Sequence, residues 1–332
     1  MLKRLHLRNF TVFADAEFEF SEFEFGDKKG INVLVGANGV GKSHVLKAGY
    51  VVDFACATTA SNQALSIVLS TGSKMYDAFD ETINELKGQF PGNTLSNLVR
   101  RPKNTAADMP IEAEIQAEIM DATGNLTFTI EASGTNNTHV KNVPVIKQSS
   151  FKPVFIPARE VLTLGWLLDY VRSSRLKGDT ESEKLPVDKT YLNLLRQLEK
   201  PPLELHDLRV QQITQRVEGI IKGDVRFEHG EFYIIPTGEP PMGINLVAEG
   251  MRKFATLYKL LANGTLTPET ALFWDEPEAN LNPALLKELA ILLTDLAQAG
   301  FQIILATHSL FLMKELHILS RQRKQPVRYF GL

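Results

Sequence analysis

The chain has 332 residues, of which 44% are hydrophobic and 23% charged, and a formal net charge of −3; these values exclude wholesale disorder and indicate one large globular domain with an insertion, or about two domains. The single cysteine, Cys56, excludes an internal disulfide and a cysteine-based metal cluster, as is typical of a reducing compartment. Because no apolar leader follows the basic start and no apolar run is long enough to span a bilayer, we expect a cytoplasmic protein without a membrane partner.

The N-terminal residues predict strands that lead to a buried one. An apolar pattern begins at Leu5, and between residues 16 and 25 phenylalanine alternates with glutamate, which is typical of edge strands with an acidic outer face. The alternation changes phase near residues 21–22, where we expect a turn or bulge. Residues 31–35 are continuously apolar and predict a central strand buried on both faces.

The next segment, residues 57–150, predicts a mixed insertion. A helical pattern covers residues 75–86, and glycine and asparagine fill the turns between alternating runs that follow it. These runs predict a small antiparallel sheet set into the chain. Its expected strands are residues 111–119, 126–132 and 143–146.

Residues 151–240 predict a mainly helical lobe. It contains a short buried strand at 154–156 and ends in a hairpin at 225–235 that turns at His229–Gly230. Beyond residue 240, helices and buried strands alternate. The expected elements are a helix at 247–261, a strand at 271–274, a helix at 283–299 with Asn282 as N-cap, and a strand at 301–307.

A phosphate-binding motif follows the strand at 31–35. Residues 36–43 read GANGVGKS, which fits G-x-x-x-x-G-K-[ST] between a strand and a helix. Backbone N–H groups and the positive end of the helix bind phosphate oxygens in such a loop, a lysine reaches the β- and γ-phosphates, and a hydroxyl ligates Mg²⁺. The alternative is a glycine-rich loop without a ligand. The expected ATP-binding residues are Gly36, Asn38, Gly39, Gly41, Lys42 and Ser43.

Two acidic residues follow the strand at 271–274. They open the segment LFWDEPEANLNP at the carboxyl end of the strand, where ligand sites of α/β sheets lie. We expect Asp275 to complete the Mg²⁺ site with Ser43, and Glu276 to act as the general base or to orient the attacking water. The alternative is a surface acidic pair that opens a turn.

A third motif, ATHS, ends the strand at 301–307. Its His308 lies one helix beyond Glu276, so that both residues end neighbouring strands of the expected sheet. We expect His308 to contact the γ-phosphate and to be the second catalytic residue. The alternative is a polar cap of the strand end.

These motifs, in this order and with the start LKRLHLRNFTVF, resemble the ABC-type ATPase heads of the RecF/SMC/OLD branch over about residues 1–55 and 240–320. Within the branch the chain is most similar to small prokaryotic AAA-type ATP-binding proteins, many of them found in anti-phage defence loci. The resemblance implies an α/β P-loop NTPase fold, an ABC-ATPase-type head with an antiparallel β insertion and a helical lobe. It divides the single head 1–332 into 1–56 with the phosphate loop, 57–150, 151–240, and 241–332 with the remaining motifs.

The resemblance also identifies residues 247–253, VAEGMRK, as the ABC signature. It implies that Glu249 and Gly250 offer a helix N-terminus to the γ-phosphate of ATP held by a second copy. The segment departs from the LSGGQ of transporters, which argues against a transporter subunit. The alternative is an ordinary amphipathic helix with Arg252 and Lys253 in solvent. Arg159 and Glu160 occupy the place of the Q-loop, where the chain has no glutamine.

The resemblance therefore implies an ATP- and Mg²⁺-dependent switch that forms a homodimer or a higher oligomer through sandwiched ATP. Roughly two dozen residues follow His308, too few for the nuclease domain of OLD relatives, so we expect a separate effector protein, in anti-phage defence. The competing interpretation is a RecF-like DNA-repair or chromosome-maintenance ATPase. Basic clusters at 100–103 and 321–328 are the candidate DNA contacts.

Overall fold

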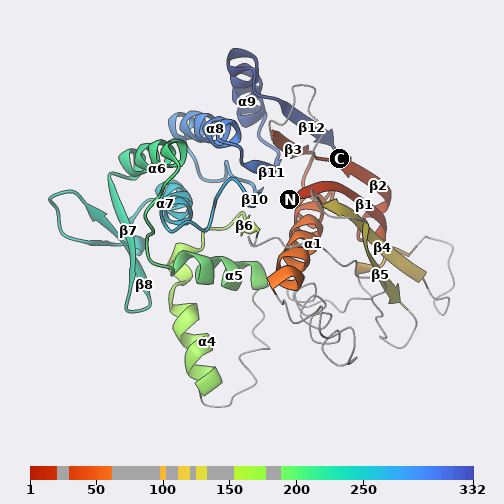
Figure 1. The fold of residues 1–332 in the computed structure, drawn as a ribbon, viewed down its shortest axis with the longest axis horizontal. Helices are drawn as coiled ribbons and strands as arrows, with labels where there is room; N and C mark the ends of the chain where they lie inside the picture. Colours follow the sequence, from red (N-terminus) through yellow and green to blue (C-terminus); the bar gives the residue numbers. More distant parts are fainter. Residues whose placement is uncertain (21–29, 62–97, 102–110, 120–124, 133–152, 177–187) are drawn as a thin grey trace.

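The computed structural model describes most of the chain (Figure 1). The described residues are 1–20, 30–61, 98–101, 111–119, 125–132, 153–176 and 188–332. The expected turn near 21–22, the helix at 75–86 and the strand at 143–146 lie outside them.

A five-stranded parallel sheet forms the centre of the molecule. Its order is β12-β3-β11-β10-β6, and every neighbouring pair is parallel. The strands expected near 31, 154, 271 and 301 are confirmed, whereas the fifth was not predicted. The bounds are β3 (Ile31–Val35), β6 (Val154–Ile156), β10 (Ala271–Asp275), β11 (Gln302–Thr307) and β12 (Val327–Gly331). Because all five strands run the same way, the residues that follow β3, β10 and β11 meet at one edge of the sheet.

A second, antiparallel sheet has the order β2-β1-β4-β5. It joins the N-terminal hairpin, β1 (Leu2–Phe10) and β2 (Phe13–Glu19), to strands of the insertion, β4 (Ile111–Ile119) and β5 (Asn125–Ala132). The antiparallel strands of the insertion are confirmed, but they do not form a sheet of their own, because β1 pairs along one side with β2 and along the other with β4. Strand β2 is at the edge of the sheet, as its acidic outer face predicts.

Helix α1 (Lys42–Ser61) lies between the two sheets (Figure 1). Its Tyr50 packs edge-on against Phe155 of β6 and Phe273 of β10, with ring centroids 5.5 and 6.2 Å apart. The next residue of β10, Trp274, belongs to the core on the opposite face of the parallel sheet. The parallel sheet is therefore buried on both faces, which explains its continuously apolar strands.

The other helices among the described residues cover the opposite face of the parallel sheet (Figure 1). They are α4 (Trp166–Leu176), α5 (Lys189–Leu198), α6 (Leu208–Ile221), α7 (Glu249–Ala262), α8 (Pro283–Gln298) and α9 (Leu310–Arg323). Helix α8 begins as predicted, with the Asn282 side chain accepting a hydrogen bond from the backbone N–H of Leu285. Helix α9 was not predicted. None of the described helices is both long and apolar enough to cross a membrane.

A small third sheet stands beside these helices. Its strands are β7 (Gly223–Glu228), β8 (Glu231–Pro236) and β9 (Met242–Gly243), and a 3₁₀ turn, η4 (Ile244–Leu246), connects it to α7. The predicted hairpin is confirmed: its turn is His229–Gly230, and both residues have positive φ.

Candidate functional site

The loop between β3 and α1 has the conformation of a phosphate-binding loop. Gly39 and Gly41 have φ values of 84° and 100°, a region that glycine adopts without a steric penalty. A Cβ on Gly41 would also stand 2.5 Å from the Val12 side chain of the β1–β2 turn. Lys42 is the first residue of α1, and its Nζ donates hydrogen bonds to the carbonyls of Gly36 and Ala37, both at 2.8 Å. The lysine therefore reaches back across the loop it follows.

Ser43 and Asp275 come together although they are far apart in the sequence. The Ser43 hydroxyl donates to Oδ2 of Asp275 over 2.7 Å. The Asp275 side chain is only 9% exposed, and its buried Oδ1 has no hydrogen-bond partner among the described residues. Burial raises the pKa of Asp275, while the Ser43 hydrogen bond and the charges of Lys47 and Lys42 lower it. A hydroxyl beside a carboxylate with an unpaired oxygen fits Mg²⁺, which prefers oxygen ligands.

Glu276 follows β10 in an unusual backbone conformation. Its φ is +43°, its N–H donates to the Ala306 carbonyl of β11 at 2.9 Å, and its own carbonyl accepts from Lys253 Nζ at 3.0 Å. A non-glycine residue in the left-handed region is uncommon and persists only where its surroundings hold it. The chain turns at Glu276, so consecutive residues 275 and 276 both lie at the carboxyl edge of the sheet.

His308 lies beside Glu276, at the end of the neighbouring strand. Its Nδ1 is 3.4 Å from Oε1 of Glu276 and 3.7 Å from Oε1 of Glu278. The imidazole is 48% exposed and the Glu276 side chain 30% exposed, so both are open to solvent. An exposed carboxylate within reach of an imidazole can take a proton from water or orient it.

Glu278 was not predicted as a site residue. Its buried carboxylate accepts from the Thr307 hydroxyl at 2.5 Å and from the His308 N–H at 3.2 Å. Glu278 thereby ties the turn after β10 to the end of β11, which carries the histidine. The sequence offered one sign of this role: Glu278 is a third acidic residue, two positions after the acidic pair.

The signature segment begins α7 without a side-chain cap. The N-cap residue is Ala248, whose side chain makes no capping hydrogen bond, and the Met251 N–H donates to the Ala248 carbonyl at 2.9 Å. Helices α5, α6, α8 and α9, in contrast, are capped by Asp188, Asp207, Asn282 and Ser309. The first N–H groups of a helix have no partner within the helix and attract anions. At the start of α7 the N–H groups of Glu249 and Gly250 are therefore the ones that no N-cap side chain accepts from.

Gly250 and Glu249 contact the turn after β10 of their own chain. A Cβ on Gly250 would lie 3.0 Å from the Asn280 carbonyl and 3.1 Å from the Leu281 side chain. Nδ2 of Asn280 donates to Oε1 of Glu249 at 2.7 Å. Close packing within one head thus explains the glycine, independently of any second copy.

The alternative that places Arg252 and Lys253 in solvent is wrong. Lys253 is 4% exposed, and burial lowers its pKa, while nearby carboxylates, with Glu278 first, raise it. Arg252 is half-buried and paired with Glu160. A sign of this was available in the helical spacing, because Lys253 shares a face with the apolar residues Leu257 and Leu260.

Two basic residues of the cluster at 321–328 form contacts within the chain. Arg323 pairs with Asp295, and Nη1 of Arg328 donates to the Glu19 carbonyl. Of the first cluster, Arg100 and Arg101 are described, and the Arg100 N–H donates to the Asn9 carbonyl at 2.7 Å. Part of the candidate DNA contacts therefore stabilises the fold.

Two segments of the chain match known protein families. Residues 159–314 match a family described as "AAA domain, putative AbiEii toxin, Type IV TA system", and residues 4–49 match one described as "AAA domain". No curated protein matches the chain. The matched segments contain the phosphate loop at one end and the acidic pair and His308 at the other.

Solved structures of SMC heads are similar in fold. An Smc head domain with an extended coiled coil, bound to the C-terminal domain of ScpA and derived from Pyrococcus furiosus, has a TM-score of 0.51 at 14% identity. An SmcHead bound to the C-winged helix domain of ScpA has a TM-score of 0.50 at 15% identity. The SMC head domain from Thermotoga maritima has a TM-score of 0.44 at 15% identity. In each case 95% of this chain and 91% of the other chain are covered.

Proposed function

We propose that this chain, whose fold is that of an ABC-type ATPase head of the RecF/SMC branch, binds ATP with Mg²⁺ and hydrolyses the ATP. One observation carries the proposal: the 2.7 Å hydrogen bond between Ser43 and Asp275, beside the unpaired Oδ1 of Asp275. It joins the phosphate loop to the acidic strand end. Ser43 and Asp275 would hold Mg²⁺, which when bound neutralises phosphate charge.

In this proposal, binding and hydrolysis use different residues. The backbone N–H groups of the glycine-rich loop surround the phosphates. Lys42 leaves the carbonyls of Gly36 and Ala37 and donates to phosphate oxygens instead. The Glu276 carboxylate takes a proton from the attacking water, and His308 contacts the γ-phosphate. Their separation of 3.4 Å allows the imidazole to orient the carboxylate.

Phosphate release from ATP tests this function. We expect Mg²⁺-dependent release by the wild-type chain and release reduced to background in Lys42→Ala, whose lost charge–phosphate contacts weaken ATP binding by about 10- to 100-fold. Lys314→Ala, which removes an exposed lysine on α9, is the matched control. Wild-type turnover by Lys42→Ala would show that the loop does not bind the reacting nucleotide.

The second part of the proposal is a pair of heads with ATP between them. The uncapped first turn of α7, with Glu249 and Gly250, would face the γ-phosphate held by the other copy. Residues 1–332 then act as one head, and hydrolysis opens the pair. Mass measurement of the chain with and without ATP tests this, and an unchanged mass would contradict it.

The third part is control of a separate effector in anti-phage defence. Two observations support it: the family matched by residues 159–314 is described as a putative toxin of a toxin–antitoxin system, and two of the similar SMC heads were solved with a domain of another protein, ScpA. We expect the product of a neighbouring gene to co-purify with the chain and to dissociate with a change of nucleotide. Stimulation of turnover by DNA ends or gaps, without such a partner, would favour the RecF-like alternative.

A further inference from the structure

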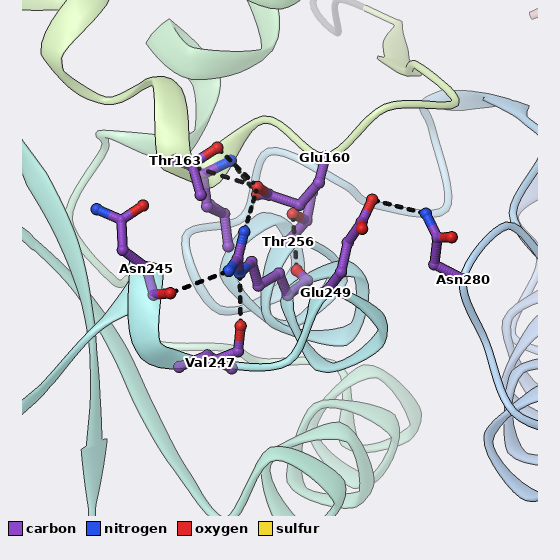
Figure 2. Close-up of polar contacts among 9 residues, drawn as sticks. Glu160, Thr163, Asn245, Val247, Glu249, Thr256 and Asn280 are labelled. Atoms are coloured by element: carbon purple, nitrogen blue, oxygen red, sulfur yellow. Dashed lines mark hydrogen bonds and ion pairs between the residues drawn. The ribbon is translucent and has the colours of Figure 1, made fainter.

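The turn that precedes α7 is held by one arginine, Arg252. Its Nε donates to the Val247 carbonyl at 2.7 Å and its Nη2 to the Asn245 carbonyl at 3.2 Å. The third group, Nη1, lies 3.4 Å from Oε2 of Glu160. Figure 2 shows the acceptor residues converging from two separate segments. Three donors of one planar guanidinium therefore fix two backbone carbonyls relative to one carboxylate.

Glu160 is itself fixed by the loop that follows β6. Its side chain is 5% exposed. One carboxylate oxygen accepts from the Leu162 N–H, and the other accepts from the Thr163 hydroxyl at 2.9 Å and from the Thr163 N–H at 3.4 Å. A buried carboxylate is tolerated when it is paired and hydrogen-bonded, as here. Arg252 is thus connected to a rigid acceptor.

The loop that carries Glu160 follows β6 and leaves the parallel sheet at its carboxyl edge, where the proposed nucleotide site lies. In the register of β6 and β10, Ile156 pairs with Trp274, the residue before Asp275. Burial raises the pKa of the Tyr191 hydroxyl on α5, and the charges of Arg159 and Asp275 act on it with opposite sign. Arg159, next to Glu160, and Asp275 therefore both lie within electrostatic range of Tyr191.

The first turn of α7 is also held from its other side. Asn280, in the turn after β10, donates to Glu249 at 2.7 Å (Figure 2). The Thr256 hydroxyl donates to the Arg252 carbonyl at 3.0 Å, one turn further along the helix. The loops that follow the neighbouring strands β6 and β10 thus both contact the first turn of α7.

We propose that Arg252 is a positioning residue, anchored by Glu160, that fixes the turn at residues 245–247 and so aims the N–H groups of Glu249 and Gly250 at the phosphate of the second head. The inference rests on the proposed pairing of heads through ATP. Arg252 acts through the backbone turn. Lysine at this position keeps the charge but, with a single point-like ammonium group, cannot hold three acceptors in three directions.

The variant that tests the proposal is Arg252→Lys. We expect it to bind ATP within about twofold of wild type in dilute, unpaired heads, because the phosphate loop is unchanged. ATP-dependent association and turnover should each fall by about tenfold or more, from the loss of at least one hydrogen bond to a charged group. Arg216→Lys, in the ion pairs with Glu288 and Asp295 between α6 and α8, is the matched control and should behave as wild type.

Mixing two defective heads separates positioning from a general structural defect. Lys42→Ala has an intact α7, and Arg252→Lys an intact phosphate loop, so each mixed pair contains one complete site. We expect the mixture to recover about a quarter of the wild-type rate, since half of the pairs are mixed and each has one of two sites. A folding defect in Arg252→Lys would not be rescued by mixing.

The other possible results would overturn either the positioning role of Arg252 or the pairing of heads. Wild-type association and turnover of Arg252→Lys, or loss of ATP binding by its dilute heads, would overturn the positioning role alone. Failure of the mixture to recover activity would do the same. A wild-type chain that hydrolyses ATP without ever associating would overturn the proposed pairing of heads, and the positioning role with it.

Discussion

Lys253 donates a hydrogen bond from its buried ammonium group to the carbonyl of Glu276 over 3.0 Å. The bond joins α7, which carries the signature segment, to the residue proposed to activate water. It stabilises a backbone conformation with φ +43° that a glutamate rarely adopts. The bond therefore links the position of α7 to the backbone of the proposed catalytic residue within one chain.

Replacing Lys253 by methionine should uncouple the two. Met keeps the length of the side chain in its buried site but does not hydrogen-bond the carbonyl, so Glu276 loses a restraint. We expect turnover to fall by about 10- to 100-fold, with ATP binding little changed, as for a lost hydrogen bond to a charged group. Lys259→Met is the matched control, since Lys259 is also buried in α7 and its pKa is also lowered by burial. Equal turnover of both variants would contradict the coupling.

Glu276→Gln should bind ATP but not consume it. The amide preserves the shape of the side chain and removes the proton acceptor, so we expect turnover to fall by about 10²- to 10⁴-fold. Pairs of heads should then accumulate with ATP and Mg²⁺, as measured by light scattering after gel filtration. Glu269→Gln, an exposed acid before β10, should turn over as wild type. Normal turnover of Glu276→Gln would remove this residue from the mechanism.

Asp275→Asn should stabilise the chain in the absence of Mg²⁺. Burial raises the pKa of Asp275, so the folded state holds this proton more tightly than the unfolded state. The contribution of the group to stability is present at low pH and is lost as the pH rises through the raised pKa. At neutral pH the variant avoids this cost, and its Tm should rise by about 1–2 °C for each kcal/mol recovered in a chain of this length.

The same variant should lose the response to the metal. Mg²⁺ with ATP should raise the Tm of the wild-type chain, because ligands that bind only the folded state stabilise it, and should leave Asp275→Asn nearly unchanged. Differential scanning fluorimetry at neutral pH compares the two. A Tm of Asp275→Asn below that of the metal-free wild type would contradict the assignment of the buried carboxylate.

Ala248→Asp should make α7 more stable and the protein less active. Aspartate at an N-cap accepts from the first-turn N–H groups and stabilises a helix by about 0.5–2 kcal/mol relative to alanine. The same carboxylate would occupy the donors proposed to bind phosphate and would repel it. We expect a raised Tm together with loss of ATP-dependent association, and a smaller loss for the uncharged cap in Ala248→Ser.

Position 248 gives a cleaner test than the signature glycine. Any side chain on Gly250 would press on the Asn280 carbonyl of its own chain, so a loss of association would have two explanations. Ala248 is exposed and leaves that packing untouched. Wild-type association of Ala248→Asp would contradict a phosphate contact by α7.

The parts of the site that the sequence predicts are contiguous motifs. In GANGVGKS and in the acidic pair after β10, neighbours in the chain remain neighbours in space, and the strand–loop–helix order fixes where they point. Contacts made by single residues across the fold could not be predicted in this way. Lys253 meets Glu276, and Glu160 meets Arg252, only because α7 packs against both loops.

In the fold, too, features set by local sequence were predicted, and features set by distant partners were not. Buried strands such as β10 have a composition that only a central position explains, and they were predicted correctly. Strand β12 carries Arg328 and Tyr329 and resembles a basic surface segment, because an edge strand tolerates polar residues. That the insertion pairs with β1 depends on a partner more than 100 residues away, which local patterns do not encode.

The position of β3 has a consequence for how the protein forms. This strand leads into the phosphate loop, yet both of its neighbours, β11 and β12, lie far beyond it in the sequence, within residues 302–331. During synthesis β3 therefore emerges well before either neighbour, and both of its edges stay unpaired until residues 302–331 have left the ribosome. Chain fragments that stop before residue 302 therefore lack both partners of β3, and the proposed nucleotide site cannot form before these strands are made.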